Sequence, residues 1–397
     1  MERPPYEVAD VVRTQGSQFI QEYGHLLNVD QRRVLHAIEN CRTAVLGGHV
    51  YECDKCRHQV ISYNSCRNRH CPKCQAAARE RWLAQRTAEL LPVPYFHVVF
   101  TLPQLRAPLA LQNKRLLYGM LFRAASETLL EVARDPKHLG AEIGFLGVLH
   151  TWGQNLLHHP HIHFVIPGGG LSADHTRWVG SGDRFLLPVK VLSRVFRGKF
   201  LSFLRSAFRK GKLAFHGNLA PLADAAQFNR LVQKAFECEW VVYAKPPFGG
   251  PEQVLRYLAR YTHRVAISNR RILSIDGDEV TFRWKDYAHG NKNKAMTVKA
   301  TEFLRRFVMH VLPKGFVRIR FFGFLANRQR AKRLQLCRRL LKAEEPTALS
   351  STGAAAEPVE RTRRCGVCDC GILREVERLP RLIGTQCVSA PRGVDSS

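Results

Sequence analysis

In the 397-residue sequence, two histidines on one predicted strand are the residues whose type and spacing most clearly suggest a chemical function. In HIHFVI (161–166), His161 and His163 flank Ile162, so both imidazoles project to one face of a strand while Ile162 faces the core. Two neutral imidazoles side by side can bind a divalent metal ion if a third ligand joins them and open positions remain for a substrate oxygen. The spacing therefore predicts a catalytic metal site.

The third ligand of this site is expected from the preceding strand, EIGFLGVLHTWGQ (142–154), which passes beside the histidine strand if residues 155–160 form the turn. Gln154 is then the favoured third ligand. His150 lies on the same face four residues earlier, and His159 is a further candidate. The alternative interpretation, that these histidines are structural, stays open at this point.

Two tyrosines on a predicted helix are candidate nucleophiles. Tyr257 and Tyr261 lie four residues apart in PEQVLRYLARYTHR (251–264), so their hydroxyls occupy one face, one turn apart. A phenolate can attack a phosphodiester and retain the cleaved strand as a phosphotyrosine ester, so rejoining needs no ATP. A metal ion on the scissile phosphate would offset the charge that develops during attack. The alternative is an apolar core stripe that the tyrosines share with Val254 and Leu258.

The twelve cysteines are clustered in a way that indicates metal binding rather than a secreted disulfide scaffold. CDKC (53–56) and CPKC (71–74) each present two thiolates on a tight knuckle, and two facing knuckles form a closed tetrahedral zinc site. The sequence thus predicts a structural Zn²⁺ ion with the ligands Cys53, Cys56, Cys71 and Cys74. Cys66, His70 and His49 are candidates for exchange with these four or for a second ion.

A second cysteine group, near the C-terminus, is a weaker half-site. It contains Cys365, Cys368 and Cys370, and only the distant Cys387 offers a fourth ligand. Cys41 stands alone and is interpreted as an ordinary thiol.

Basic residues outnumber acidic ones throughout the chain, with a formal net charge of +28 and a pI near 10.1. A field of this sign favours a polyanion, and nucleic acid is the commonest one in a cell. The alternative is a basic surface without a partner. The absence of a G-x-x-x-x-G-K-[ST] phosphate loop argues against an ATP-driven motor. No long apolar run and no secretion signal occur, so an intracellular protein without a membrane span is expected.

The elements that must position these residues mix strands and helices. Strands are expected at 95–101, 142–154, 161–166, 239–245 and 316–324, with a hairpin around Gly277, and helices at 75–91, 105–135, 189–209, 223–236, 251–264, 300–311 and 327–342. Because hairpins dominate, the predicted fold class is α+β around a central antiparallel sheet. Three regions follow: an N-terminal zinc-binding domain (1–94), a catalytic domain (95–342), and a linker with a cysteine-containing tail (343–397).

Taken together, the motifs resemble a known family. HPHIH (159–163) resembles the His-hydrophobic-His motif of HUH endonucleases, YLARY (257–261) their two-tyrosine signature, and FTLP (100–103) their first strand motif. The likeness to the insertion sequence 91 type of transposase extends over residues 30–342, and its further motifs are SCRNRHCPKCQ (65–75), HTWGQNL (150–156), RWKDY (283–287) and HVLPKGFVRIR (310–320). The tail beyond residue 343 matches least.

This resemblance implies an HUH-type catalytic domain, with helices flanking its antiparallel sheet, and a small zinc-binding domain that helps to recognise DNA. Such enzymes nick single-stranded DNA at element ends, become joined to the 5′ phosphate through tyrosine, and drive rolling-circle-like transposition. His161 and His163 would hold Mg²⁺ or Mn²⁺ with Gln154, and Tyr257 and Tyr261 would be the nucleophiles. The implied partners are element ends, target DNA and the host replication machinery, in the cytoplasm at the bacterial nucleoid.

Two other functions compete with this interpretation. A plasmid or phage rolling-circle replication initiator or relaxase would share the metal and tyrosine chemistry, but the zinc unit and the missing ATPase motif favour the transposase. A non-enzymatic, zinc-dependent DNA-binding regulator would bind with strong salt dependence and would form no covalent adduct.

Overall fold

The computed structural model describes residues 4–103, 107–182, 186–245, 266–286, 290, 292–343 and 363–382. These residues form helices and antiparallel sheets, which confirms the predicted α+β fold class. The chain divides into two compact units. Unit 1 comprises residues 1–77, 267–305 and 347–397, and unit 2 comprises residues 78–266 and 306–346.

Unit 2 is built on a five-stranded sheet in which all neighbouring strands are antiparallel. Its strands, in spatial order, are β12 (Ile319–Gly323), β4 (Gly144–Trp152), β5 (His158–Pro167), β3 (Tyr95–Thr101) and β8 (Val242–Lys245). Side chains alternate between the two faces of each strand, as the period of two requires. Phe100 and Phe164 point into the core, where the ring of Phe100 packs edge-on against Phe164 and Phe196 at centroid distances of 5.7 and 5.0 Å.

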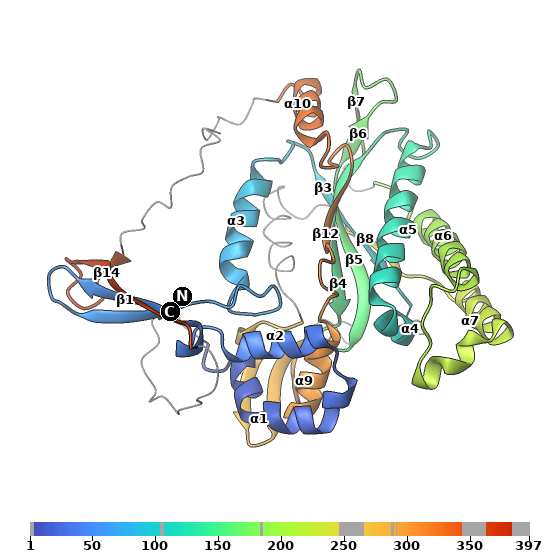
Figure 1. Ribbon diagram of the computed structural model, residues 1–397. Helices are drawn as coiled ribbons and strands as arrows, with labels where there is room; N and C mark the ends of the chain where they lie inside the picture. The colour runs from blue at the N-terminus through green and yellow to red at the C-terminus, as the bar shows by residue number, and fades with distance from the viewer. Residues whose placement is uncertain are drawn as a thin grey trace. The chain divides into compact units, whose positions relative to one another are not determined.

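Four helices of unit 2 lie on one side of this sheet (Figure 1). They are α4 (Ala107–Gln112), α5 (Lys114–Arg134), α6 (Val189–Arg209) and α7 (Ala225–Glu237). The buried residues of α5 and α6 recur at helical spacing, as with Leu117 and Leu121, or Phe196 and Phe200. This helical layer buries one face of the sheet, so the histidines that point the other way lie outside the main apolar core.

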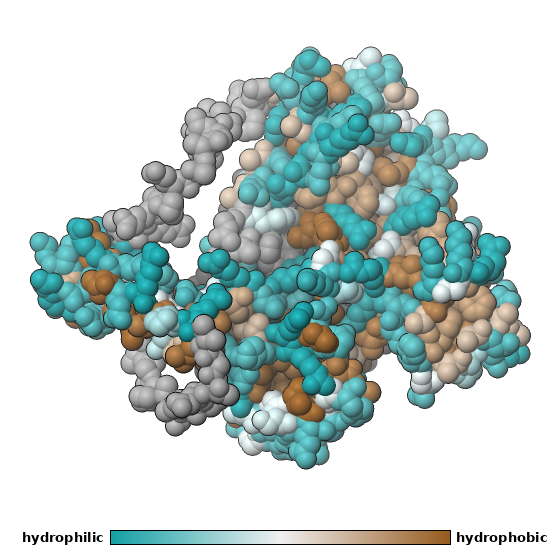
Figure 2. All heavy atoms as spheres, in the orientation of Figure 1, coloured by the Kyte–Doolittle hydropathy of each residue, from teal (hydrophilic) through white to brown (hydrophobic). Residues whose placement is uncertain are grey.

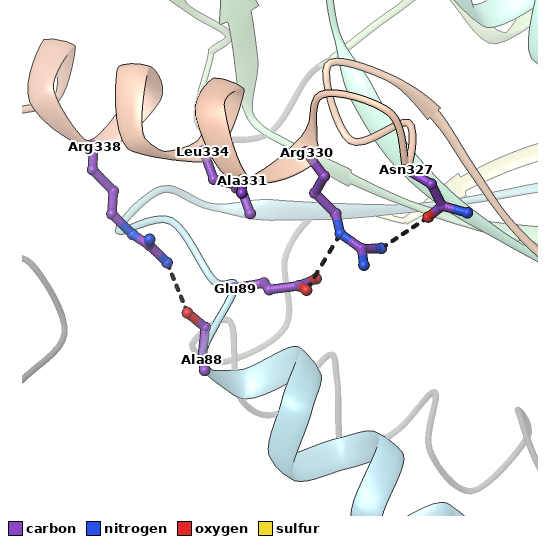
Figure 3. A pocket seen from close by; sticks show the side chains of 7 residues that line it. All are labelled: Ala88, Glu89, Asn327, Arg330, Ala331, Leu334 and Arg338. Carbon is purple, nitrogen blue, oxygen red and sulfur yellow. Dashed lines mark hydrogen bonds and ion pairs between the residues drawn. The ribbon is translucent and has the colours of Figure 1, made fainter. Parts of the chain in front are cut away.

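A basic helix, α10 (Arg330–Leu340), packs against the segment that follows α3 (Gln75–Thr87) in unit 2. Leu334 of α10 is buried, and two arginines beside it make internal contacts (Figure 3). The Arg338 guanidinium donates to the Ala88 carbonyl at 2.7 Å, and that of Arg330 lies 3.4 Å from the Glu89 carboxylate. Two of the positive charges of α10 are therefore engaged in contacts inside unit 2.

The two-stranded sheet of β6 (Gly169–Leu171) and β7 (Trp178–Gly180) also belongs to unit 2.

Unit 1 contains two sheets and two N-terminal helices, α1 (Val8–Tyr23) and α2 (Val29–Glu39). One sheet has the order β11-β10-β9, with bounds Lys292–Lys299, Glu279–Asp286 and Ile272–Asp276. The other has the order β13-β14-β1-β2, with bounds Arg363–Arg364, Ile372–Leu379, Gly48–Cys53 and Gln59–Tyr63. Helix α9 (Ala300–Met309) follows β11, and 3₁₀ helices occupy Gly24–Leu26, Ala44–Leu46 and Asn269–Arg271. A further 3₁₀ helix, Gly217–Ala223, lies in unit 2.

The compact units combine segments that are far apart in the sequence, and the expected domain boundaries at residues 94 and 342 stay a prediction. Residues 267–305, expected in the catalytic domain, group with the N-terminal helices, because the Val8 N–H donates to Asn269 Oδ1 at 3.2 Å and the Gln15 amide to the Gly277 carbonyl at 3.0 Å. The tail also joins unit 1, because β14 pairs with β1. Contacts between segments that are distant in the sequence, and not only the order of the segments, therefore define the two units.

Among the described helices, none has the length and apolar composition that a membrane crossing requires.

Candidate metal centres

Three histidines from two adjacent strands converge on the face of the sheet opposite the one that α4, α5, α6 and α7 cover. His150 of β4 lies directly opposite His161 of β5 in the strand register, and His163 is two residues further along β5. One ring nitrogen of each lies within 4.8 Å of the others. The strand register therefore assembles a three-imidazole group of the kind that binds a divalent metal ion.

Two of these imidazoles are held in the form that a metal ion requires. His161 Nδ1 lies 2.6 Å from the His159 carbonyl oxygen, and because a carbonyl only accepts, Nδ1 carries the proton and Nε2 keeps its lone pair. Burial lowers the pKa of His161 to about 3 and that of His163 well below its ordinary value. Both rings are thus neutral at pH 7.

The turn between β4 and β5 is shorter than expected. Strand β5 begins at His158, which pairs with Trp152, whereas the sequence suggested a turn over 155–160. The irregularity between His150 and Trp152 accommodates the extra residue and keeps His150 opposite His161. Gln154 lies half-buried in this turn, and its role as a ligand stays a prediction.

His97 of β3 contacts the three-histidine group through His163 and was not singled out in the sequence. Its Nε2 lies 2.7 Å from His163 Nδ1, and the two rings are stacked with centroids 5.0 Å apart. A metal-binding histidine commonly has its second nitrogen held in this way, which fixes the orientation of the ring. The strand alternation in YFHVVFT was the available signal, because His97 falls on the same face as Val99, the register partner of His163.

The His97→Ala variant is expected to weaken divalent-metal binding by about 10- to 100-fold, since the ring of His163 loses its second contact. Calorimetric titration of the purified chain with Mn²⁺ would measure the change. His216→Ala, at an exposed position, serves as the matched control and should bind as the wild type does. Equal affinities for all three proteins would contradict this role of His97.

His310, in a motif for which the sequence suggested no role, holds the β4–β5 turn. Its Nε2 lies 2.9 Å from the Leu156 carbonyl and therefore donates, while the Thr151 hydroxyl lies 3.2 Å from Nδ1. Leu156 adopts a left-handed conformation with φ 63°, so the bond restrains a strained residue. His310 thus positions the end of the strand that carries His150.

The first cysteine group lies entirely in the N-terminal part of unit 1. Its members are Cys41, Cys66, Cys71 and Cys74, with the Cys74 sulfur 3.5 Å from that of Cys41 and 3.6 Å from that of Cys66. Four sulfurs about 2.3 Å from a central zinc ion lie roughly 3.8 Å apart, whereas a disulfide needs about 2.05 Å. The spacing fits a tetrahedral zinc site. Hydrogen bonds from the Cys66 and Cys71 thiols lower the pKa of Cys41 to about 7, which favours the thiolate.

The second cysteine group corrects the ligand set expected from the sequence. Cys53 and Cys56 do not face Cys71 and Cys74; they lie with two cysteines of the tail, in the set Cys53, Cys56, Cys365 and Cys368. The expected set failed because β14 pairs with β1 and carries the tail cysteines to the first knuckle. Cys41 is correspondingly a member of a metal group and not an ordinary thiol.

The remaining candidates from the sequence lie elsewhere. His70 is outside both sulfur groups, with its Nδ1 3.1 Å from Asn68 Oδ1. Cys370 is exposed and is not part of the second group. Tyr257, Tyr261 and Cys387 lie outside the described residues.

An antiparallel sheet with a three-histidine group and a cysteine-rich unit defines an α+β protein with candidate metal sites of two kinds. Residues 144–333 match the family described as "Putative transposase", and residues 11–102 match "Transposase zinc-binding domain". The chain belongs to the insertion sequence 91 type of transposase, with an N-terminal zinc-binding domain.

Two named relatives support this membership. The "Putative transposase y4qJ" of Sinorhizobium fredii is 54% identical over 385 residues, which cover 95% of this chain and 96% of the relative. The "Transposase for insertion sequence element IS801" of Pseudomonas savastanoi pv. phaseolicola is 30% identical over 310 residues, which cover 77% and 73%. No solved structure matches the chain.

Proposed function

We propose that this transposase nicks and rejoins single-stranded DNA at the ends of its element through a covalent 5′-phosphotyrosine, with a divalent metal ion at the histidine group. The observation that carries the proposal is the convergence of His150, His161 and His163 on one face of the sheet in a chain of this family. Gln154, from the adjoining turn, is the proposed oxygen ligand. Mg²⁺ or Mn²⁺ held there would polarise the scissile phosphate and stabilise the charge of the transition state.

The path of the chain supports Tyr257 and Tyr261 as the nucleophiles. Strand β8 ends at Lys245, which is the register partner of His97, and the His97 ring contacts His163. Lys245, the last described residue before the tyrosines, is therefore paired with the strand that lies beside β5. Tyr257 follows Lys245 by twelve residues, which span at most about 40 Å even when fully extended, so this tyrosine lies no further than that from the end of β8.

The chemistry balances without an external energy source. The phenol oxygen of one tyrosine attacks phosphorus and loses its proton, and the 3′ oxygen of the upstream strand leaves and gains one. The 5′ end then remains on the enzyme, and attack by another 3′ hydroxyl reverses the step and joins two strands. The freed 3′ hydroxyl would prime synthesis by the host replication machinery, which gives the rolling-circle-like route.

Covalent trapping tests this proposal. Labelled single-stranded DNA from both flanks of the gene is incubated with the protein and Mn²⁺ or a chelator, then resolved on a denaturing gel. We expect a metal-dependent adduct that disappears when Tyr257→Phe and Tyr261→Phe are combined. Tyr243→Phe, at an exposed position of β8, is the matched control and should retain the adduct.

Two outcomes would contradict the tyrosine mechanism. An adduct that survives in the double variant would assign the nucleophile to another residue. Tight binding to the same strands without any adduct would instead favour a DNA-binding regulator. Terminal sequences beside the gene distinguish a transposase from a replication initiator or relaxase.

Helix α10 is a proposed contact for the DNA backbone. Its surface is largely hydrophilic (Figure 2) and exposes Lys332 and Arg339, whereas Arg330 and Arg338 are turned to internal contacts. Exposed basic side chains bind phosphates and release counterions, so their loss lowers both the affinity and its salt dependence.

The Lys332→Ala, Arg339→Ala double variant is expected to reduce the slope of log K against log salt by about 0.7 for each lost phosphate contact to single-stranded DNA. Fluorescence anisotropy over a salt series would measure it. The matched control removes Arg230 and Lys234, exposed basic residues of α7. An equal loss in both double variants would show that total charge, and not α10, governs binding.

A further inference from the structure

The second cysteine group is built from the two ends of the chain. Cys53 is the last residue of β1 and Cys56 follows it, while Cys365 and Cys368 belong to the tail. Cys365 lies 309 residues beyond Cys56 in the sequence. The Cys53–Cys368 and Cys56–Cys365 sulfur distances are both 3.6 Å. They match the roughly 3.8 Å expected around a tetrahedral zinc ion and are far longer than the bond of about 2.05 Å in a disulfide.

The two halves of this group have the same local geometry. The backbone N–H of Lys55 donates to Cys53 Sγ at 3.4 Å, and that of Val367 donates to Cys365 Sγ at the same distance. In each half, the first cysteine of a C-x-x-C pair thus accepts from the residue two positions later. Such bonds stabilise the negative charge of a thiolate ligand. The tail therefore presents a second knuckle that matches the first.

Backbone pairing brings the two knuckles together. Strand β14 runs antiparallel to β1 from the pair Gly48–Leu379 to the pair Cys53–Leu373. At the knuckles, the Asp54 N–H donates to the Ile372 carbonyl at 3.0 Å, and the Ile372 N–H donates to Asp54 Oδ1 at 2.8 Å.

The close approach of the two knuckles requires a glycine at position 371. A Cβ atom at this position would overlap the Cys53 sulfur and crowd Lys55. The residue before β14 must therefore lack a side chain for Cys53 to keep its place in the sulfur group.

We propose that Cys53, Cys56, Cys365 and Cys368 bind a second structural Zn²⁺ ion, which ties the C-terminal segment to the N-terminal β1–β2 hairpin. The family's zinc-binding domain, matched over residues 11–102, contains only the first half of this site. Ligands that are protonated release their protons as the ion binds. The site cannot be completed until synthesis has passed Cys368, so this ion binds only after the catalytic region has been made.

Zinc content tests the proposal independently of DNA chemistry. The full chain, purified under reducing conditions, is expected to contain two zinc ions by elemental analysis. The Cys365→Ser, Cys368→Ser double variant should contain one, and Gly371→Ala should also contain one, although it keeps every cysteine. Cys370→Ser is the matched control, because this exposed cysteine lies beside the knuckle but outside the group, and it should retain two.

A cleavage experiment tests the tie itself. A protease site is inserted after residue 350, between α10 and the tail, and the full chain is cut without denaturation. The C-terminal fragment should co-elute with the body in the otherwise wild-type protein and separate from it in the Cys365→Ser, Cys368→Ser background.

Three results would overturn the inference. The first is a single zinc ion in the wild type. The second is a content of two ions in the Cys365→Ser, Cys368→Ser variant. The third is co-elution of the fragment whether or not these cysteines are present, which would show that strand pairing alone holds the tail.

Discussion

The His161→Ala, His163→Ala double variant is expected to lose DNA nicking by about a thousandfold or more, because a catalytic metal ion contributes several kcal/mol to the transition state. Both side chains project from the same face of β5 toward His150. Removing them leaves one imidazole of the group, which cannot hold the ion. Binding of the same single strands should be preserved, because the phosphate contacts proposed here come from basic side chains outside the histidine group.

The measurement compares the rate of metal-dependent nicking with the affinity for the same labelled strand. His138→Ala, at an exposed position of unit 2, is the control and should nick normally. His150→Ala extends the test, since loss of metal-dependent activity there would support this residue as a ligand. Normal nicking by the double variant would refute the metal assignment.

The Cys66→Ser, Cys74→Ser double variant is expected to lose one zinc ion and to unfold the N-terminal part of unit 1. Structural zinc contributes apparent binding free energies of about 10–16 kcal/mol, which equals or exceeds the total stability of roughly 5–15 kcal/mol of a typical domain. The loop with Cys66, Cys71 and Cys74 is joined to the end of α2 through Cys41, so losing the ion frees both.

Zinc content and limited proteolysis of residues 41–74 would measure this effect. Cys238→Ser is the matched control, because Cys238 is half-buried in unit 2 and lies outside both sulfur groups. Changing Cys53 together with Cys71 should remove both ions, since the two residues belong to different groups. An unchanged zinc content in the Cys66→Ser, Cys74→Ser variant would contradict the first site.

Local patterns predicted much of the fold. The strand at 95–101 and the helix at 189–209 coincide with β3 and α6, and the hairpin around Gly277 forms as β9 and β10. These elements are readable because burial repeats every two residues in a strand and every three or four in a helix. The short strands of the sheet beside the second cysteine group escaped prediction, since most of their side chains are not buried and their pattern is weak.

The sequence by itself determined that His161 and His163 share a face, because alternation along a strand depends only on neighbouring residues. It also determined that the C-x-x-C pairs form knuckles, because two positions separate the thiols in each.

The tertiary structure alone decided the partners of these groups. The antiparallel register set His150 against His161 and brought His97 to His163. The pairing of β14 with β1 joined Cys53 to Cys368, 315 residues away. Spacing along the chain specifies the halves of a metal site, whereas which halves meet depends on the strand pairing that buries the rest of the chain.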